Sequence, residues 1–208
     1  SKLHGMAGLR VGYALAPPTS PNLFGVADVA GGMVSHTLAD VRDAGALRKA
    51  LAAAAPEAVF HLAAQPLVRH SYAEPVETFD VNVLGTQHIV SAIEAMESKP
   101  LLAYCSSMAV FGPQDKPPPR TVNEQPIASD HYTRHKIACE EMVQCLRSPW
   151  VILRLGGMAD SRMRNRGLAP AKYAFAMSAN NRFEYIHPKD AATAFVNALT
   201  QTAAHNKI

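Results

Sequence analysis

The chain has 208 residues, which is enough for one compact domain with a hydrophobic core. Hydrophobic residues make up 48% of it and charged residues 18%, as is ordinary for a globular protein. The formal net charge is only +3 and the chain has no run of lysine or arginine, so the charge pattern does not favour nucleic acid as a partner. The densest basic stretch, at residues 161–167 (SRMRNRG), is interpreted as a solvated loop or an anion contact.

The cysteine content and the hydropathy of the chain indicate in which cellular compartment the protein is expected. Cys105, Cys139 and Cys145 have no metal-like spacing, and we expect them to be buried or half-buried free thiols in a reducing environment. No apolar run approaches the roughly 20 residues that span a bilayer. Residues 1–8 also lack the apolar segment of a signal peptide. These features predict a cytoplasmic, soluble protein without a membrane partner.

Short apolar runs alternate with helix-like segments along the chain. The strands are predicted at residues 11–15, 33–38, 58–64, 101–107, 150–155 and 182–186. The helices are predicted at residues 44–55, 74–96, 129–142 and 189–203, with Asp43 as the N-cap of the first of them.

This alternation predicts the fold class. Continuously apolar strands separated by helices are typical of a parallel sheet covered on both faces, so we predict an α/β, Rossmann-like, doubly wound fold. Ligands of such sheets bind beyond the C-terminal ends of the strands. Polar residues lie at the ends of predicted strands or just after them, namely Asp40, Gln65, Ser106 and Ser107. We expect a dinucleotide-binding domain over residues 1–155, and a short substrate region over 156–208 whose last strand and helix pack on the same domain.

Tyr132 and Lys136 are the first candidates for chemistry. They are four residues apart on a predicted helix, so their side chains share one face. A nearby ammonium favours the phenolate form of a tyrosine, which allows proton transfer near neutral pH. Ser107, at the end of a neighbouring strand, could hold a substrate oxygen beside them. The same spacing also suits a surface pair on a helix whose other face is core, and both interpretations stay open.

Several motifs occur in a telling order around this pair. They are LADVRD (38–43), VFHLAAQ (59–65), NVLGT (82–86), SSMAVFG (106–112), YTRHK (132–136) and HPKDAATA (187–194). Their order resembles the extended short-chain dehydrogenase/reductase superfamily, in particular the NAD-dependent epimerase/dehydratase family. The first half of the chain is most similar to CDP-glucose 4,6-dehydratases, and the second half to more general members of the family.

The resemblance implies a cofactor, a substrate and the residues that bind them. The cofactor would be NAD, with NADP as the other choice, and the substrate a nucleotide sugar. The implied catalytic residues are Ser107, which orients the substrate, Tyr132 as acid and base, and Lys136, which binds the nicotinamide ribose. The implied cofactor-binding residues are Asp40, Val41, Leu62, Ala63, Ala64, Asn82, Ser106, Tyr132, Lys136 and Leu155. The implied substrate contacts are Gln65, Ser107, Met108, Gly157 and Met158.

Two departures from the family pattern sharpen these expectations. Met108 and Ala109 stand where 4,6-dehydratases carry an acid that helps to expel water, so epimerisation or simple oxidation and reduction is favoured over dehydration. The family also opens with a strand and a glycine-rich phosphate loop. Only four residues precede Gly5 here, so we expect the first strand and the loop to be lacking and dinucleotide binding to be weak or absent. The sheet must then close the gap or expose its edges.

Two further functions therefore stay open: a catalytically silent Rossmann-type sensor or binding module, and an interaction protein that associates through sheet edges, for example as a homo-oligomer. His131 and His135 have a spacing that metal ligands use on helices. We interpret them as a solvated helix face and predict no metal site. His61 is predicted to be a buried strand residue, and His187 a structural residue at the last helix.

Overall fold

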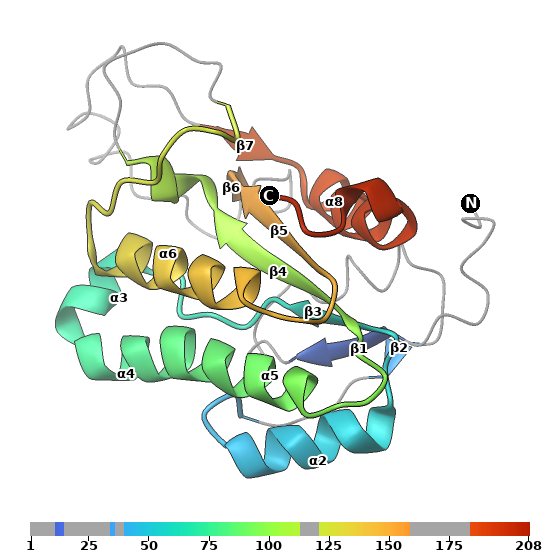
Figure 1. The fold of residues 1–208 in the computed structure, drawn as a ribbon. Coiled ribbons are helices and arrows are strands. Elements are labelled where there is room, and N and C mark those ends of the chain that lie inside the picture. Colours follow the sequence, from blue (N-terminus) through green and yellow to red (C-terminus); the bar gives the residue numbers. More distant parts are fainter. Residues whose placement is uncertain (1–10, 15–33, 36–39, 113–120, 159–183) are drawn as a thin grey trace.

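The computed structural model describes residues 11–14, 34–35, 40–112, 121–158 and 184–208 (Figure 1). The strands are β1 (Val11–Ala14), β2 (Val34–Ser35), β3 (Ala58–His61), β4 (Leu101–Ser107), β5 (Trp150–Leu155), β6 (Gly157–Met158) and β7 (Tyr185–Ile186). The α-helices are α2 (Ala44–Ala54), α3 (Val68–Ala73), α4 (Pro75–Phe79), α5 (Gly85–Glu94), α6 (His131–Gln144) and α8 (Pro188–Thr200). A π-helical turn, η1 (Asp80–Leu84), and two 3-10 turns, η2 (Met108–Phe111) and η4 (Thr202–Ala204), complete the described elements.

The main sheet has five parallel strands in the order β2-β1-β3-β4-β5. β6 and β7 form a separate parallel pair. β1 pairs directly with β3, with Val11 opposite Ala58 and Ala14 opposite His61. The family pattern would have a separate first strand at this place. In the described sheet β1 and β3 are direct neighbours there, without a gap between them. The predicted α/β class with a parallel sheet is confirmed.

Two apolar layers cover the sheet, one on each face. On one face α2, α5 and α6 contribute Leu51, Ile89 and Cys139 to a core that includes Leu102 and Ile152 of the strands. On the other face α8 packs Ala192 and Phe195 on Phe60, Ala103 and Val151. Figure 1 shows α5 and α6 on one side of the sheet and α8 on the other. Burial on both faces explains why β3, β4 and β5 read as continuous apolar runs.

The outer edge of β5 is covered by the C-terminal residues. Asn206 N donates to Trp150 O at 2.6 Å, and Ile152 N donates to Lys207 O at 3.0 Å. Val151 and Lys207 form a parallel bridge. Because its hydrogen-bonding groups are used in this way, this edge is closed to another chain at these positions.

Three of the described helices begin at residues whose side chains act as N-caps. Asp43 accepts a hydrogen bond from Ala46 N at 2.9 Å, which confirms it as the N-cap of α2. Asp130 and Thr133 form a reciprocal capping box at the start of α6. His187 caps α8, as expected for a structural residue, and Pro188 occupies the first turn.

Three local predictions are corrected by the structure. Residues 68–73, which lie between the predicted strand at 58–64 and the predicted helix at 74–96, form α3. The predicted helix at 74–96 is present but contains the π-helical turn η1. Cys139 is buried and Cys105 half-buried as expected, but Cys145 is exposed because it forms the solvent-facing C-cap of α6.

Several predictions fall on residues outside the described ranges. They concern the residues around Gly5, where the first strand and phosphate loop are expected to be lacking, the basic stretch at 161–167 and most of the strand predicted at 33–38. Among the described residues, no helix is long and apolar enough to cross a bilayer.

Candidate active site

Tyr132 and Lys136 lie in the first two turns of α6, packed against β4. They are only 9% and 4% exposed, so the alternative of a surface pair is wrong. Lys136 Nζ donates to the carbonyl of Cys105 at 2.7 Å, near the C-terminal end of β4. The ammonium lies 5.9 Å from the Tyr132 ring centroid and 4.9 Å from that of Tyr104. The capping box formed by Asp130 and Thr133 fixes the start of this helix.

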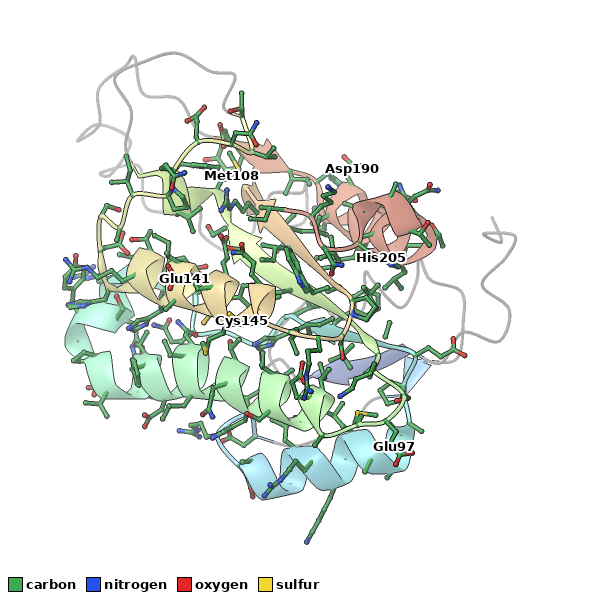
Figure 2. All side chains as sticks on the ribbon, in the orientation of Figure 1. Glu97, Met108, Glu141, Cys145, Asp190 and His205 are labelled. Atoms are coloured by element: carbon green, nitrogen blue, oxygen red, sulfur yellow. The ribbon has the colours of Figure 1, made fainter. Side chains whose placement is uncertain are left out.

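Ser107 is the last residue of β4 and is half-buried. It also caps η2, where its Oγ accepts a hydrogen bond from Ala109 N at 3.2 Å. This role as acceptor leaves the hydroxyl proton able to donate to a ligand oxygen. Met108, half-buried, follows at once and lies just beyond the end of β4 (Figure 2). The sequence therefore placed a serine hydroxyl at the edge of the sheet where parallel α/β folds bind ligands.

Asn82 holds the main chain that follows β3. It lies in the π-helical turn η1 and is 3% exposed. Its Oδ1 accepts from Gln65 N at 2.7 Å, and its Nδ2 donates to Gln65 O at 3.0 Å. Such π-helical turns are frequent at functional sites. Asn82 thus fixes the main chain of Gln65, just beyond the end of β3.

Gln65 itself is largely occupied by its own loop. Its Oε1 accepts from Leu67 N at 2.6 Å, and its Nε2 donates to Leu67 O and to Thr78 Oγ1, both at 3.1 Å. The three residues before it continue from β3 into the same edge: Ala63 is buried, and Leu62 and Ala64 are half-buried. Their small or apolar side chains line the path from β3 towards Asn82.

Asp40 and Val41 lie apart from the Tyr/Lys pair, just before α2. Asp40 is exposed, and Arg42 donates from Nε to its Oδ1 at 3.0 Å and from Nη2 to its Oδ2 at 2.5 Å. These bonds lower the pKa of the Asp40 carboxyl. Val41 is buried, and its carbonyl accepts a hydrogen bond from His88 at 2.9 Å. In this structure the carboxylate of Asp40 is thus already paired.

The remaining implied residues lie around the end of β5. Leu155 is half-buried and pairs in register with Ser107 of β4. Gly157 and Met158 form β6 and pair with β7. Gly156 suits this junction because a Cβ at that position would meet Glu184 O at 2.9 Å. The structure therefore gathers Ser107, Leu155 and the start of β6 at one edge.

A row of buried polar side chains lies behind Lys136. His61 is 1% exposed, and its Nε2 is 2.8 Å from Thr86 Oγ1. Thr86 donates its own proton to Asn82 O at 2.6 Å, so Nε2 of His61 must carry the hydrogen in their bond. Burial, followed by the charge of Lys136, lowers the pKa of His61 to about 3. Burial also raises the pKa of Tyr104. Both groups are therefore neutral beside the Lys136 ammonium.

The sequence predicted that the two histidines of α6 lie on a solvated helix face, and this prediction is wrong in part. His131 and His135 are half-buried, and their rings lie edge-on to Tyr72 at 5.0 Å and to Phe79 at 5.6 Å. Desolvation lowers the pKa of His135. Within the described ranges no group of three or more His, Cys, Asp or Glu side chains could hold a metal ion.

One buried cluster was missed by the sequence analysis. The hydroxyl of Ser106, implied as a cofactor contact, points into the core and donates to Glu140. Any contact of Ser106 with a cofactor would therefore come from its main chain. Glu140 in turn pairs with Arg154. A signal was present, because Tyr132, Lys136 and Glu140 recur at intervals of four residues on one face of α6.

A parallel sheet with a buried Tyr/Lys pair, whose lysine bonds to the strand that ends in Ser107, is typical of a Rossmann-like protein of the short-chain dehydrogenase/reductase type. The chain belongs to the NAD dependent epimerase/dehydratase family, whose sequence profile matches residues 14–208. The resemblance inferred from the motifs is therefore confirmed.

Individual relatives are matched over part of their length. Over 89 residues the chain is 46% identical to CDP-glucose 4,6-dehydratase of Salmonella typhimurium. This match covers 43% of this chain and 24% of that protein. Over 79 residues it is 40% identical to UDP-glucose 4-epimerase of Mycoplasma genitalium, covering 38% and 23%. The matches thus span about a quarter of these two relatives.

The fold is shared more widely than the sequence. The structure of Thermus thermophilus UDP-glucose 4-epimerase in complex with NAD superposes with a TM-score of 0.75. The two chains are 21% identical, and the match covers 92% of this chain and 74% of that one. At this identity the likeness supports the Rossmann-like fold alone.

Proposed function

We propose that this protein transfers a hydride between a nucleotide sugar and NAD, with Tyr132 and Lys136 as the reactive pair. The observation that carries the proposal is the burial of Lys136 beside the Tyr132 ring, with Nζ fixed on the Cys105 carbonyl. A buried ammonium is costly unless it is paired and hydrogen-bonded, so its retention at this place favours a role in chemistry. Its position at the C-terminal edge of the sheet is where α/β proteins of this type bind ligands.

The described residues fit one end of a dinucleotide. Lys136 offers a cation that can bind ribose hydroxyls, while Ala63 and Ala64 leave room for a close approach of the ligand to the main chain. Leu155, at the end of β5, offers an apolar contact. NAD, when bound, accepts or returns the hydride. The expected lack of the phosphate loop concerns residues outside the described ranges, so the prediction of weak binding stays a prediction that a titration decides.

Each catalytic residue then has a separate task. Ser107 donates its hydroxyl proton to the sugar oxygen and orients it. Tyr132 removes a proton from that oxygen or returns one to it. The Lys136 ammonium, 5.9 Å from the centre of the Tyr132 ring, supplies a positive charge next to this acid and base.

Epimerisation or reduction is proposed in preference to dehydration. Met108 is half-buried and Ala109 exposed at the start of η2, directly after Ser107. Neither side chain can give or take a proton, so neither can assist the loss of water. The chain is therefore similar in sequence to a CDP-glucose 4,6-dehydratase, but it lacks the acid that the family resemblance implies for dehydration.

We also propose that residues 156–208 act as a short substrate region on the same body as residues 1–155. The packing of Phe195 of α8 on Phe60 of β3, with ring centroids 5.8 Å apart, supports this arrangement. β6 and β7 then stand next to the end of β5, where a sugar would meet Ser107.

Calorimetry with NAD tests the proposal first. A dissociation constant in the micromolar range supports it and refutes the prediction of weak binding. The appearance of reduced-cofactor absorbance on addition of CDP- or UDP-linked sugars would then establish hydride transfer. Failure of both experiments would contradict the proposal and favour a catalytically silent module.

A further inference from the structure

A charged pair is buried one helical turn beyond Lys136. Glu140 of α6 and Arg154 of β5 have side chains that are only 2% and 7% exposed. Arg154 donates from Nε to Glu140 Oε1 at 3.0 Å and from Nη2 to Oε2 at 2.6 Å. The hydroxyl of Ser106 on β4 also donates to Oε1. We call these three residues the Glu140 anchor.

The anchor continues the row of residues that begins with Tyr132. Tyr132, Lys136 and Glu140 are four residues apart and share one face of α6. Lys136 bonds to the carbonyl of Cys105, and Glu140 accepts the hydroxyl of the next residue, Ser106. Two neighbouring residues of β4 thus hold two successive turns of α6. A rotation of α6 about its axis would break both attachments and carry Tyr132 away from the end of β4.

Arg154 links the same helix to the segment that carries Ser107. It lies opposite Ser106 in the register of β4 and β5. Its guanidinium carbon is 4.8 Å from the ring centroid of Phe111, in the turn η2 that begins directly after Ser107. Nη1 is buried and has no hydrogen-bond partner among the described residues, so Arg154 depends on Glu140 for its charge compensation.

Stability alone does not account for such a pair. Replacing a buried ion pair by apolar residues of similar volume is often neutral or stabilising. What apolar residues cannot reproduce is the direction of the bonds: two from a planar guanidinium and one from a hydroxyl, all to one carboxylate. The geometry therefore favours a role in orientation.

We propose that Glu140 is a positioning residue, which through Arg154 and Ser106 fixes the rotation of α6 that sets Lys136 and Tyr132 at the end of β4. The inference deepens the proposed function and rests on it for the chemistry. The attachment of Lys136 can be measured without turnover.

The test is a variant that removes the anchor but keeps the volume, Glu140→Met/Arg154→Met/Ser106→Ala. Lysine acetylation is followed by mass spectrometry in the parent and in this variant, and thermal unfolding is recorded for both. We expect a similar melting temperature but Lys136 acetylation faster by about tenfold, the effect of weakening one strong hydrogen bond. Lys49, exposed on α2, is the internal control and should react at the same rate in both proteins. The control variant Arg147→Met removes a 78% exposed ion-pair partner and should leave Lys136 slow.

An unchanged rate at Lys136 in the folded triple variant would overturn the proposal. If the triple variant does not fold, Ser106→Ala alone is labelled, and the same two results decide. Where the parent shows turnover, the triple variant should lose kcat with little change in KM. If the parent binds no cofactor and shows no turnover, the proposed function fails, while the labelling still decides whether Glu140 positions the helix.

Discussion

The carboxamide of Asn82 offers the sharpest test of how the site edge is held. It uses both of its polar atoms on the main chain of Gln65, as acceptor at 2.7 Å and as donor at 3.0 Å. The change Asn82→Asp keeps the size and the acceptor but removes the donor. At neutral pH a carboxylate would face the carbonyl of Gln65, which is a repulsive contact in a buried place.

The magnitude follows from the bond that is lost and from the group left unpaired. A buried carbonyl without its donor costs about 1–3 kcal/mol. Burial of the new charge adds to this, so we expect a loss of roughly 2–4 kcal/mol at pH 7. Protonation of the introduced carboxyl restores a donor. Burial raises the pKa of such a carboxyl above the ordinary value of about 3.9, so the loss should be smaller at about pH 4.

The assay is urea unfolding of the parent and the variant at both pH values. Asn197→Asp is the matched control, because Asn197 is exposed on α8, and we expect it to change the unfolding free energy by less than about 0.5 kcal/mol. An Asn82→Asp variant that loses the same free energy at both pH values would refute the reasoning. So would a loss no larger than that of the control.

Three further outcomes are expected. His61, whose pKa is lowered to about 3, stays neutral with its hydrogen on Nε2. Below about pH 6.5 the histidine of the unfolded state takes up a proton that the folded state does not. The contribution of His61 to stability is therefore complete above about pH 6.5 and falls by about 1.4 kcal/mol per pH unit below it. Nitrogen NMR of the ring and unfolding at pH 7.5 and 5 check this, and a His61 signal that titrates near pH 6.5 would contradict it. Glu140→Ala leaves Arg154 buried without its partner and should cost about 3–5 kcal/mol. Arg147→Ala, on the surface, should cost less than about 1 kcal/mol in the same urea titration, and equal costs would argue against a buried pair. Asp130→Ala removes the capping box of α6 and should cost about 0.5–2 kcal/mol, measured by thermal unfolding, whereas an unchanged melting temperature would mean that the cap is not formed.

The elements that the sequence predicted well are those whose residues are buried on both sides. β4 and β5 begin and end where the apolar runs 101–107 and 150–155 do. Asp43 was recognisable as a cap because aspartate is a preferred N-cap and an alanine-rich helical segment follows it. Tyr132, Lys136 and Ser107 were proposed from their spacing and from the family resemblance, and they lie on α6 and β4, which pack together.

The features that the sequence concealed depend on contacts between distant residues. Arg154 lies in the run WVILRL, which reads as an apolar strand, and Glu140 reads as a solvated helix residue until its partner is known. Ser106 looked like a ligand contact because it follows the apolar part of a strand, but the alternation of side chains along β4 turns it towards α6. The π-helical turn at Asp80–Leu84 has no sequence signature of its own, since its residues suit an ordinary helix.

The most direct test of the central claim is the rate of hydride transfer in Tyr132→Phe compared with Tyr72→Phe. Tyr72 is 59% exposed on α3, so its variant controls for the loss of a phenol hydroxyl elsewhere. With NAD and a turned-over nucleotide sugar, we expect Tyr132→Phe to be slower than the parent by about 100-fold or more, as for the loss of a general acid or base, while Tyr72→Phe keeps the parental rate. Equal rates in the parent and in Tyr132→Phe would contradict the account.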